Sequence, residues 1–196
     1  ILDYLSLGYV NSDMSKFKGK AIAQAIGTDY FTLLELVPKR GVDLEIQDTV
    51  YIGKGKRDQI YKVLGKLDYE NLTATSRIEL EYSIREIVNN NEEKFVDFFN
   101  TAGAISTRLH KLELIPGIGK KYMWEIVEAR KEKPFESFED ITTRIPSLNN
   151  PAEMIVNRVK QELDTTTAKK GKKKYYLFTP IPKTQKKHRN NRNQRK

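Results

Sequence analysis

The sequence of 196 residues contains no cysteine and only two histidines. Without cysteine the chain can form no disulfide framework, no thiolate nucleophile and no zinc site built on cysteine. No stretch approaches the length of an apolar membrane span, and no signal peptide is recognisable at the start. We therefore expect a cytoplasmic protein with no membrane partner, long enough for one domain or two small ones.

Acidic residues are missing from the C-terminal segment. Residues 165–196 hold 12 of the 35 Lys and Arg residues and none of the 26 acids, so the body is mildly acidic and the net charge of +9 comes from the tail. A polyanion must then be bound by local patches together with a cationic arm. We predict that residues 164–196 form this arm. Its island, Tyr175 to Pro182, has strand propensity, and we favour its docking on the body as an edge strand over its lying in RNA. The arm's candidate binding residues are Lys169, Lys170, Lys172, Lys173, Lys174, Lys186, Lys187, Arg189 and Arg192.

The stretch with the most specific pattern is Leu-Ile-Pro-Gly-Ile-Gly-Lys-Lys at residues 114–121. Apolar residues at i, i+4 and i+7 predict a helix before it, and a similar stripe predicts a second helix after it. The stripes are Ile105, Leu109 and Leu112, and then Ile118, Tyr122, Ile126 and Ala129. Proline stops the first helix, and the two glycines leave the backbone of the turn bare. The first N–H groups of the second helix lack intrahelical partners and therefore suit a phosphate.

This stretch resembles the helix-hairpin-helix motif, which grips a nucleic-acid backbone without reading its sequence. The resemblance implies that Gly117, Gly119 and Lys120 contact phosphate and that Ile118 locks the hairpin to the core. The candidate site comprises Pro116, Gly117, Ile118, Gly119, Lys120 and Lys121. Lysines strengthen such binding because they release counterions from a polyanion. The alternative interpretation is a helical hairpin used only for packing or for protein contact.

A shift of about thirty residues aligns Ile145-Pro146-Ser147-Leu148-Asn149 with Ile115-Pro116-Gly117-Ile118-Gly119. Both glycines are replaced in this second copy, so we expect it to pack rather than to bind. The linker Pro134 to Ile141 carries two aromatics that close the bundle, and its Ser137 is expected to cap a short helix. Residues 105–163 are therefore predicted to be a tandem domain whose second copy is degenerate.

The N-terminal region alternates in the manner of short β-strands. Five strands are expected within residues 1–72, one of them at Val50 to Ile52, with a hairpin turn at Gly27-Thr28-Asp29. Five short strands favour a small closed or partly open β-barrel, and we expect it to be OB-like. A basic loop at residues 53–57 supplies Lys54, Lys56 and Arg57 as further candidate contacts to phosphate.

Residues 73–104 are predicted to form two helices that bridge the barrel and the hairpin domain. Ser76-Arg77-Ile78-Glu79 has the form of a capping box, and Asn89-Asn90-Asn91 breaks the first helix. The second helix is expected to start at Glu92. The fold class is then α+β: an N-terminal OB-like β-barrel, a helical helix-hairpin-helix domain and a basic C-terminal arm.

The chain carries no recognisable catalytic constellation. Ser106 and His110 stand four residues apart without an acidic residue to orient the histidine, and no carboxylates have metal-ligand spacing. We expect no enzyme activity, no metal and no cofactor.

The whole arrangement resembles an uncharacterised archaeal family that joins an OB-like domain to a tandem helix-hairpin-helix domain. The resemblance spans most of residues 1–163. We predict a non-catalytic nucleic-acid-binding protein, with rRNA favoured over DNA because a lysine-rich arm suits rRNA contacts, and with ribosomal proteins as further partners. The alternatives are a DNA-binding accessory protein in repair or recombination and a scaffold for protein contacts.

Overall fold

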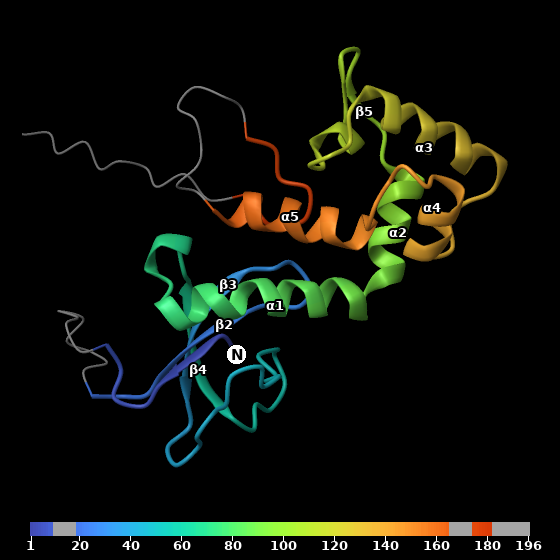
Figure 1. The fold of residues 1–196 in the computed structure, drawn as a ribbon. Helices are drawn as coiled ribbons and strands as arrows, with labels where there is room; N and C mark the ends of the chain where they lie inside the picture. The colour runs from blue at the N-terminus through green and yellow to red at the C-terminus, as the bar shows by residue number, and fades with distance from the viewer. Residues whose placement is uncertain (10–18, 165–173, 182–196) are drawn as a thin grey trace, which may run out of the picture.

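The computed structural model describes residues 1–9, 19–164 and 174–181, which form an α+β fold as the sequence predicted (Figure 1). The strands are β1 (Asp3–Leu5), β2 (Ile22–Ile26), β3 (Leu33–Pro38), β4 (Ile60–Lys66), β5 (Ala104–Ser106) and β6 (Leu109–His110). The α-helices are α1 (Ala74–Asn90), α2 (Glu92–Thr101), α3 (Lys120–Glu132), α4 (Phe138–Arg144) and α5 (Pro151–Leu163). Two short 3-10 helices are η1 (Tyr69–Asn71) and η2 (Lys111–Leu114). Among these helices, none has both the length and the apolar character needed to cross a membrane.

The N-terminal strands form an antiparallel sheet in the order β1-β2-β3-β4. The predicted turn joins β2 to β3, where Phe31 N–H donates to the Gly27 carbonyl at 2.9 Å. Phe31 takes a positive φ of 52° and buries its ring fully, with its centroid 6.0 Å from that of Phe95 in α2. Because of this turn, β3 begins only at Leu33.

The sheet is not closed into a barrel, so the expected β-barrel is corrected to an open sheet, and the OB-like assignment is not confirmed. Val50 to Ile52, expected to be a strand, belongs to the irregular connection between β3 and β4. Val50 and Ile52 instead pack beside Leu44 and Ile60 on one face of the sheet. Because this loop already covers the apolar face, the sheet buries these residues without another strand pair.

Helix α1 covers the other face of the sheet. The sequence predicted Ser76 as the N-cap of this helix, but the N-cap is Thr73. Thr73 Oγ1 accepts a hydrogen bond from Ser76 N–H at 3.0 Å and donates one to Asp3 Oδ2 at 2.6 Å. The buried Gln24 of β2 accepts a hydrogen bond from Thr73 N–H at 3.0 Å through its Oε1. Tertiary contacts with two strands therefore select the cap, which the local pattern could not show. Helix α1 ends at Asn90 and α2 begins at Glu92, as predicted.

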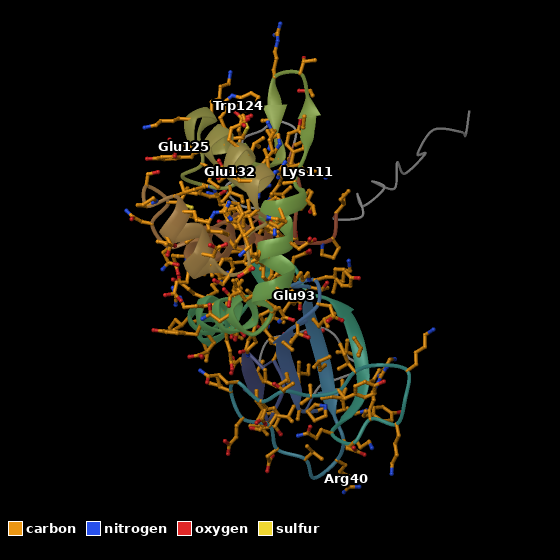
Figure 2. All side chains as sticks on the ribbon, turned by 90° about the vertical axis from the view of Figure 1, so that its right-hand side faces the viewer. Arg40, Glu93, Lys111, Trp124, Glu125 and Glu132 are labelled. Atoms are coloured by element: carbon orange, nitrogen blue, oxygen red, sulfur yellow. The ribbon has the colours of Figure 1, made fainter. Side chains whose placement is uncertain are left out.

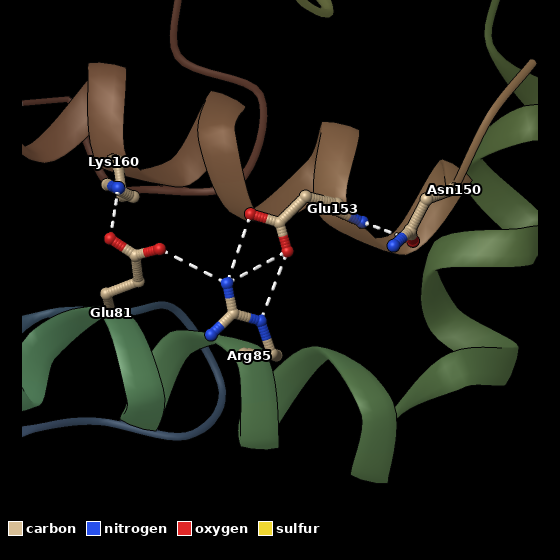
Figure 3. A network of polar contacts seen from close by, with 5 residues as sticks. All are labelled: Glu81, Arg85, Asn150, Glu153 and Lys160. Atoms are coloured by element: carbon tan, nitrogen blue, oxygen red, sulfur yellow. Dashed lines mark hydrogen bonds and ion pairs between the residues drawn. The ribbon is translucent and has the colours of Figure 1, made fainter.

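Helix α5 lies along α1, and ion pairs join the two helices (Figure 3). Arg85 Nη2 lies 3.1 Å from Glu81 Oε1 and 3.0 Å from Glu153 Oε2, and Lys160 Nζ lies 2.5 Å from Glu81 Oε2. The hydrogen bond from Lys160 is the main reason that the pKa of Glu81 lies below its ordinary value. Arg85 and Lys160 are therefore already matched by carboxylates.

One continuous apolar core runs from the α1 face of the sheet through α1 and α2 to the three C-terminal helices. It includes Leu33 of β3, Ile84 of α1, Phe99 of α2 and Ile126 of α3. Phe135 of the linker is buried in it, and Ser137 caps α4 by accepting a hydrogen bond from Asp140 N–H at 3.0 Å, as the sequence predicted. This shared core holds the C-terminal helices firmly against the rest of the fold.

Candidate nucleic-acid interface

The turn before α3 exposes its backbone while its two isoleucines are buried. Ile118 N–H donates to the Ile115 carbonyl at 3.1 Å, and both side chains lie in the core. Between them stand Pro116 and Gly117, whose φ of 90° is the left-handed conformation that a type II turn requires after proline. Gly117 and Gly119 are exposed. Ile118 is thus buried as expected of the residue that locks the hairpin, and the glycine backbone faces solvent.

The second copy also forms a turn at the matching position, as the thirty-residue repeat predicted, but Ser147 does not share the positive φ of Gly117. Leu148 N–H donates to the Ile145 carbonyl at 2.9 Å, and both of these side chains are buried. Each turn contacts the helix of the other copy. A Cβ added at Gly117 would lie 3.3 Å from Met154 Cε in α5, and Ser147 Oγ donates to Glu125 Oε2 of α3 at 3.2 Å. The two copies therefore pack reciprocally.

The two copies differ at the N-terminus of the helix that follows the turn. In the second copy Asn150 Oδ1 accepts a hydrogen bond from Glu153 N–H at 3.0 Å and Pro151 occupies the first turn. In the first copy Gly119 provides no side-chain cap, and the first turn of α3 contains no acidic residue. Every other α-helix in the described residues has a side-chain cap or an acidic first turn. The N–H groups at the start of α3 are thus left to an external acceptor.

Lysines stand where a helix normally prefers acids. Lys120 and Lys121 open α3 beside the positive end of its dipole, an arrangement that costs stability unless an anion is bound. Lys121 Nζ lies 3.9 Å from Glu125 Oε1 and remains 82% exposed, so that pair is weak. Lys120 is exposed, and no carboxylate among the described residues forms an ion pair with it.

Trp124 is a surface feature that our sequence analysis missed. It is the only tryptophan of the chain, it is 59% exposed, and it follows Lys120 by one helical turn on the same face of α3. The signal was present in the sequence, because Trp124 falls outside the apolar stripe of Tyr122, Ile126 and Ala129. A large aromatic side chain off the buried stripe of an amphipathic helix is expected to face solvent.

The helix expected before the turn does not form. Residues 104–110 instead pair as the β5-β6 hairpin, followed by η2. Ser106 Oγ accepts a hydrogen bond from Arg108 N–H at 3.3 Å, a local bond that competes with helix formation. His110 then starts η2: its Nδ1 accepts from Leu112 N–H at 3.2 Å while Glu113 Oε1 accepts from His110 N–H at 2.7 Å. Burial, followed by the charge of Arg130, lowers the pKa of His110 and favours the neutral ring that this cap needs.

The predicted basic loop at residues 53–57 lies beside the N-terminal sheet, away from the turn at residues 116–121 (Figure 1). Lys54 and Lys56 are exposed, but Arg57 Nε donates to the Gly53 carbonyl at 3.0 Å and so helps to close the loop. Of the arm's candidate residues, only Lys174 is described, and its Nζ donates to the Asp164 carbonyl at 3.0 Å. The others, Lys169, Lys170, Lys172, Lys173, Lys186, Lys187, Arg189 and Arg192, lie outside the described residues.

The island at residues 174–181 docks on the body, as predicted, though not as a strand. The buried carboxylate of Glu162 in α5 accepts hydrogen bonds from the N–H groups of Leu177, Phe178 and Thr179 at 2.7, 3.0 and 2.9 Å. The ring of Phe178 packs edge-on against two phenylalanines of α2, Phe95 and Phe98. No sequence motif pointed to Glu162 as the residue that holds this segment.

Arg158 of α5 places the docked island beside the exposed turn. Its side chain is 11% exposed and donates to Glu162 Oε1 at 2.8 Å, to the Leu114 carbonyl at 3.0 Å and to the Tyr175 carbonyl. Leu114 stands two residues before Pro116. Arg158 is therefore a structural bridge and not a surface cation, and it connects the backbone at Tyr175 to the backbone at Leu114.

Serine at Gly117 and serine at Gly119 are expected to have opposite effects on stability. Gly117→Ser forces a side chain into a left-handed φ beside Met154 and should lower the free energy of unfolding by about 1–2 kcal/mol. Gly119→Ser meets no atom within 4 Å at an ordinary φ of −88° and supplies a cap, so it should leave the stability unchanged or raise it. Urea denaturation of both variants measures this, and equal losses would contradict the assignment of the turn.

Comparison with known proteins places the chain in a family. The family model described as "Protein of unknown function (DUF655)" matches residues 1–180. The "Uncharacterized protein MJ0038" of Methanocaldococcus jannaschii is 46% identical over 178 residues, which are 91% of this chain and 77% of that protein. The crystal structure of Af1531 from Archaeoglobus fulgidus, also assigned to this family, superposes with a TM-score of 0.79 at 43% identity, covering 92% of this chain and 97% of that one. The chain therefore belongs to the DUF655 family of proteins of unknown function, in agreement with the archaeal resemblance noted in its sequence.

Proposed function

We propose that this protein binds the phosphate backbone of nucleic acid through the turn at residues 116–121, and that the two packed turns are a tandem helix-hairpin-helix unit. The observation that carries the proposal is the uncapped start of α3, where bare glycine backbone is followed by Lys120 and Lys121. Among the described α-helices, only α3 lacks both a side-chain cap and an acidic residue in its first turn. Such exceptions are expected at functional sites, where a ligand supplies what the fold omits.

The degenerate copy supports the same interpretation by contrast. It repeats the turn, the buried pair and the following helix, yet Asn150 and Glu153 fill the positions that would meet a phosphate. The fold therefore does not require an uncapped helix after such a turn. The difference between the copies indicates that the first one is kept open for a ligand.

The partner we favour is RNA, in the ribosome or a ribosome-assembly particle. The sequence is rich in lysine on both sides of the docked island, and Arg158 connects that island to Leu114, two residues before Pro116. Long cationic segments of this composition suit the dense phosphate of folded RNA. We further propose that the sheet within residues 1–72, an open relative of the expected OB-like barrel, offers a second surface to the same ligand.

The variant Lys120→Ala/Lys121→Ala tests the proposal. Fluorescence anisotropy with a labelled RNA duplex should give a weaker affinity and a plot of log K against log salt that is shallower by about 1.8, since two phosphate contacts are lost. Lys131→Ala, which removes an exposed lysine paired with Glu128, is the matched control and should leave the slope unchanged. A matching DNA duplex shows which nucleic acid is preferred.

Equal salt slopes for the wild type and the double variant would overturn the role of the turn. In cell lysate, the wild type should sediment with ribosomal particles in a sucrose gradient and be released by ribonuclease. Sedimentation as a small protein, unchanged by ribonuclease, would contradict the ribosomal partner and leave the DNA-binding accessory as the leading candidate.

A further inference from the structure

A second concave site lies at the end of the molecule opposite the hairpin. Figure 2 shows Arg40 at one end and Trp124 at the other. Arg40 borders a cleft of about 520 Å³, a volume within the range of small-molecule sites. The cleft takes lining residues from β1 and from β4, the two edge strands of the sheet. Because the sheet does not close, the side chains of both edges are available to one cavity.

The walls of this cleft combine apolar surface with an aromatic ring. Val37, Pro38 and Val42 contribute aliphatic surface, and Tyr61 of β4 stands at the cleft with 71% of its surface exposed. A flat ring beside an apolar wall is the arrangement on which a nucleobase stacks.

The charge around the cleft is positive. Lys20, Lys39 and Arg40 line it, and neither Lys39 nor Arg40 forms an ion pair with any carboxylate of the described residues. Asp43 is the one acid among the described lining residues, and its Oδ1 already accepts a hydrogen bond from the Tyr4 hydroxyl at 3.0 Å. The second carboxylate oxygen can accept from a hydroxyl of a sugar. The cleft therefore suits a ligand that is aromatic at one end and anionic at the other.

We propose that this cleft binds a nucleoside 5′-phosphate unit, with the base stacked on Tyr61 and the phosphate held by Lys39 and Arg40. The unit is either a free nucleotide or an unpaired residue of RNA. In the second case the inference deepens the proposed function, because one strand would then engage both ends of the protein. Two sites at opposite ends favour a long ligand, since binding at the first raises the effective concentration at the second.

Two probes and four variants of the full chain test this site. Isothermal titration with 5′-AMP and anisotropy with a labelled adenosine hexanucleotide should both show binding. Tyr61→Ala should weaken it about tenfold, as stacking on one aromatic side chain implies. Arg40→Ala should weaken it several-fold. Tyr82→Ala is the matched control, because Tyr82 of α1 is 58% exposed and does not line the cleft, and it should bind as the wild type does.

The outcomes separate the two sources of ligand and the two proposals. A hexanucleotide affinity well above that of 5′-AMP assigns the cleft to RNA, and equal affinities assign it to a free nucleotide. Lys120→Ala/Lys121→Ala should keep its affinity for 5′-AMP, because those lysines lie at the other end of the molecule. If Tyr61→Ala binds both probes as the wild type does, or neither probe binds, the cleft proposal is wrong. Salt-dependent binding of the duplex would then still support the hairpin.

Discussion

Glu162→Ala is expected to lower the free energy of unfolding by about 3–5 kcal/mol, the usual cost of removing one partner from a buried ion pair. The Glu162 side chain is fully buried, and its two oxygens accept from three backbone N–H groups, from the Thr179 hydroxyl and from Arg158. Alanine would leave Arg158 Nε–H and those donors without their acceptor, and the guanidinium would lose its only carboxylate partner among the described residues while keeping the carbonyls of Leu114 and Tyr175. Equilibrium denaturation in urea, followed by circular dichroism, measures the loss.

Two further variants make this test specific. Glu128→Ala removes a carboxylate that is 63% exposed and paired with Lys131, so it should change stability by about 0.5 kcal/mol or less. Glu162→Gln keeps the shape and one acceptor oxygen, but its NH₂ group faces donors, so the loss should be intermediate. Limited proteolysis of Glu162→Ala should cut within residues 174–181 faster than in the wild type. An Ala variant as stable as the wild type would show that the docked island contributes nothing.

The docked island illustrates what sequence reasoning can and cannot supply. Its strand propensity and its aromatic residues predicted that it would leave solvent, and Phe178 does pack on α2. The residue that fixes it could not be predicted, because Glu162 sits in a helix whose periodicity only marks a buried position. A carboxylate at a buried position must be paired with hydrogen-bond donors or a cation, but which groups supply them depends on how the chain packs.

Both turns of the C-terminal repeat could be predicted from the sequence because their chemistry is local. Ile-Pro at the same place in each copy fixes a turn with two buried neighbours, and Gly117 adopts the positive φ that its type II form requires. The prediction of a helix before the first turn was wrong, because local hydrogen bonds decide the structure there as well. Three apolar residues at helical spacing are weak evidence beside the local hydrogen bonds of Ser106 and His110, which commit residues 104–114 to a hairpin and a 3-10 turn.

The N-terminal sheet shows the limit set by long-range pairing. Four of the five expected strands form, and their apolar patterns, alternating in the first two, located each of them to within a few residues. Whether a sheet closes depends on the relation between its edge strands, which no local pattern encodes. The cleft between Tyr4 and Tyr61 is a consequence of that relation, so it could only be recognised once β1 and β4 were seen as edges.

Gly119→Asp is expected to separate the stability of the protein from its function. The position has an ordinary backbone conformation and no atom within 4 Å of an added Cβ, so aspartate fits there without strain. Its carboxylate would cap the N–H groups of α3 and interact favourably with Lys120 and with the helix dipole, raising the free energy of unfolding by about 0.5 kcal/mol. The same carboxylate would occupy the place proposed for a phosphate and repel it. Affinity for an RNA duplex at moderate salt should fall about thirtyfold.

The degenerate copy offers the matched control for this substitution. Asn150→Asp adds the same charge at the N-terminus of α5, where a side chain already accepts from Glu153 N–H, so RNA affinity should stay close to that of the wild type. A general electrostatic effect of one added acid would lower binding equally in both variants. Loss of binding in Gly119→Asp alone, together with unchanged or higher stability, would therefore assign the affinity to the open end of α3. If Gly119→Asp binds RNA as tightly as the wild type, the turn is structural and the phosphate contacts lie elsewhere in the protein.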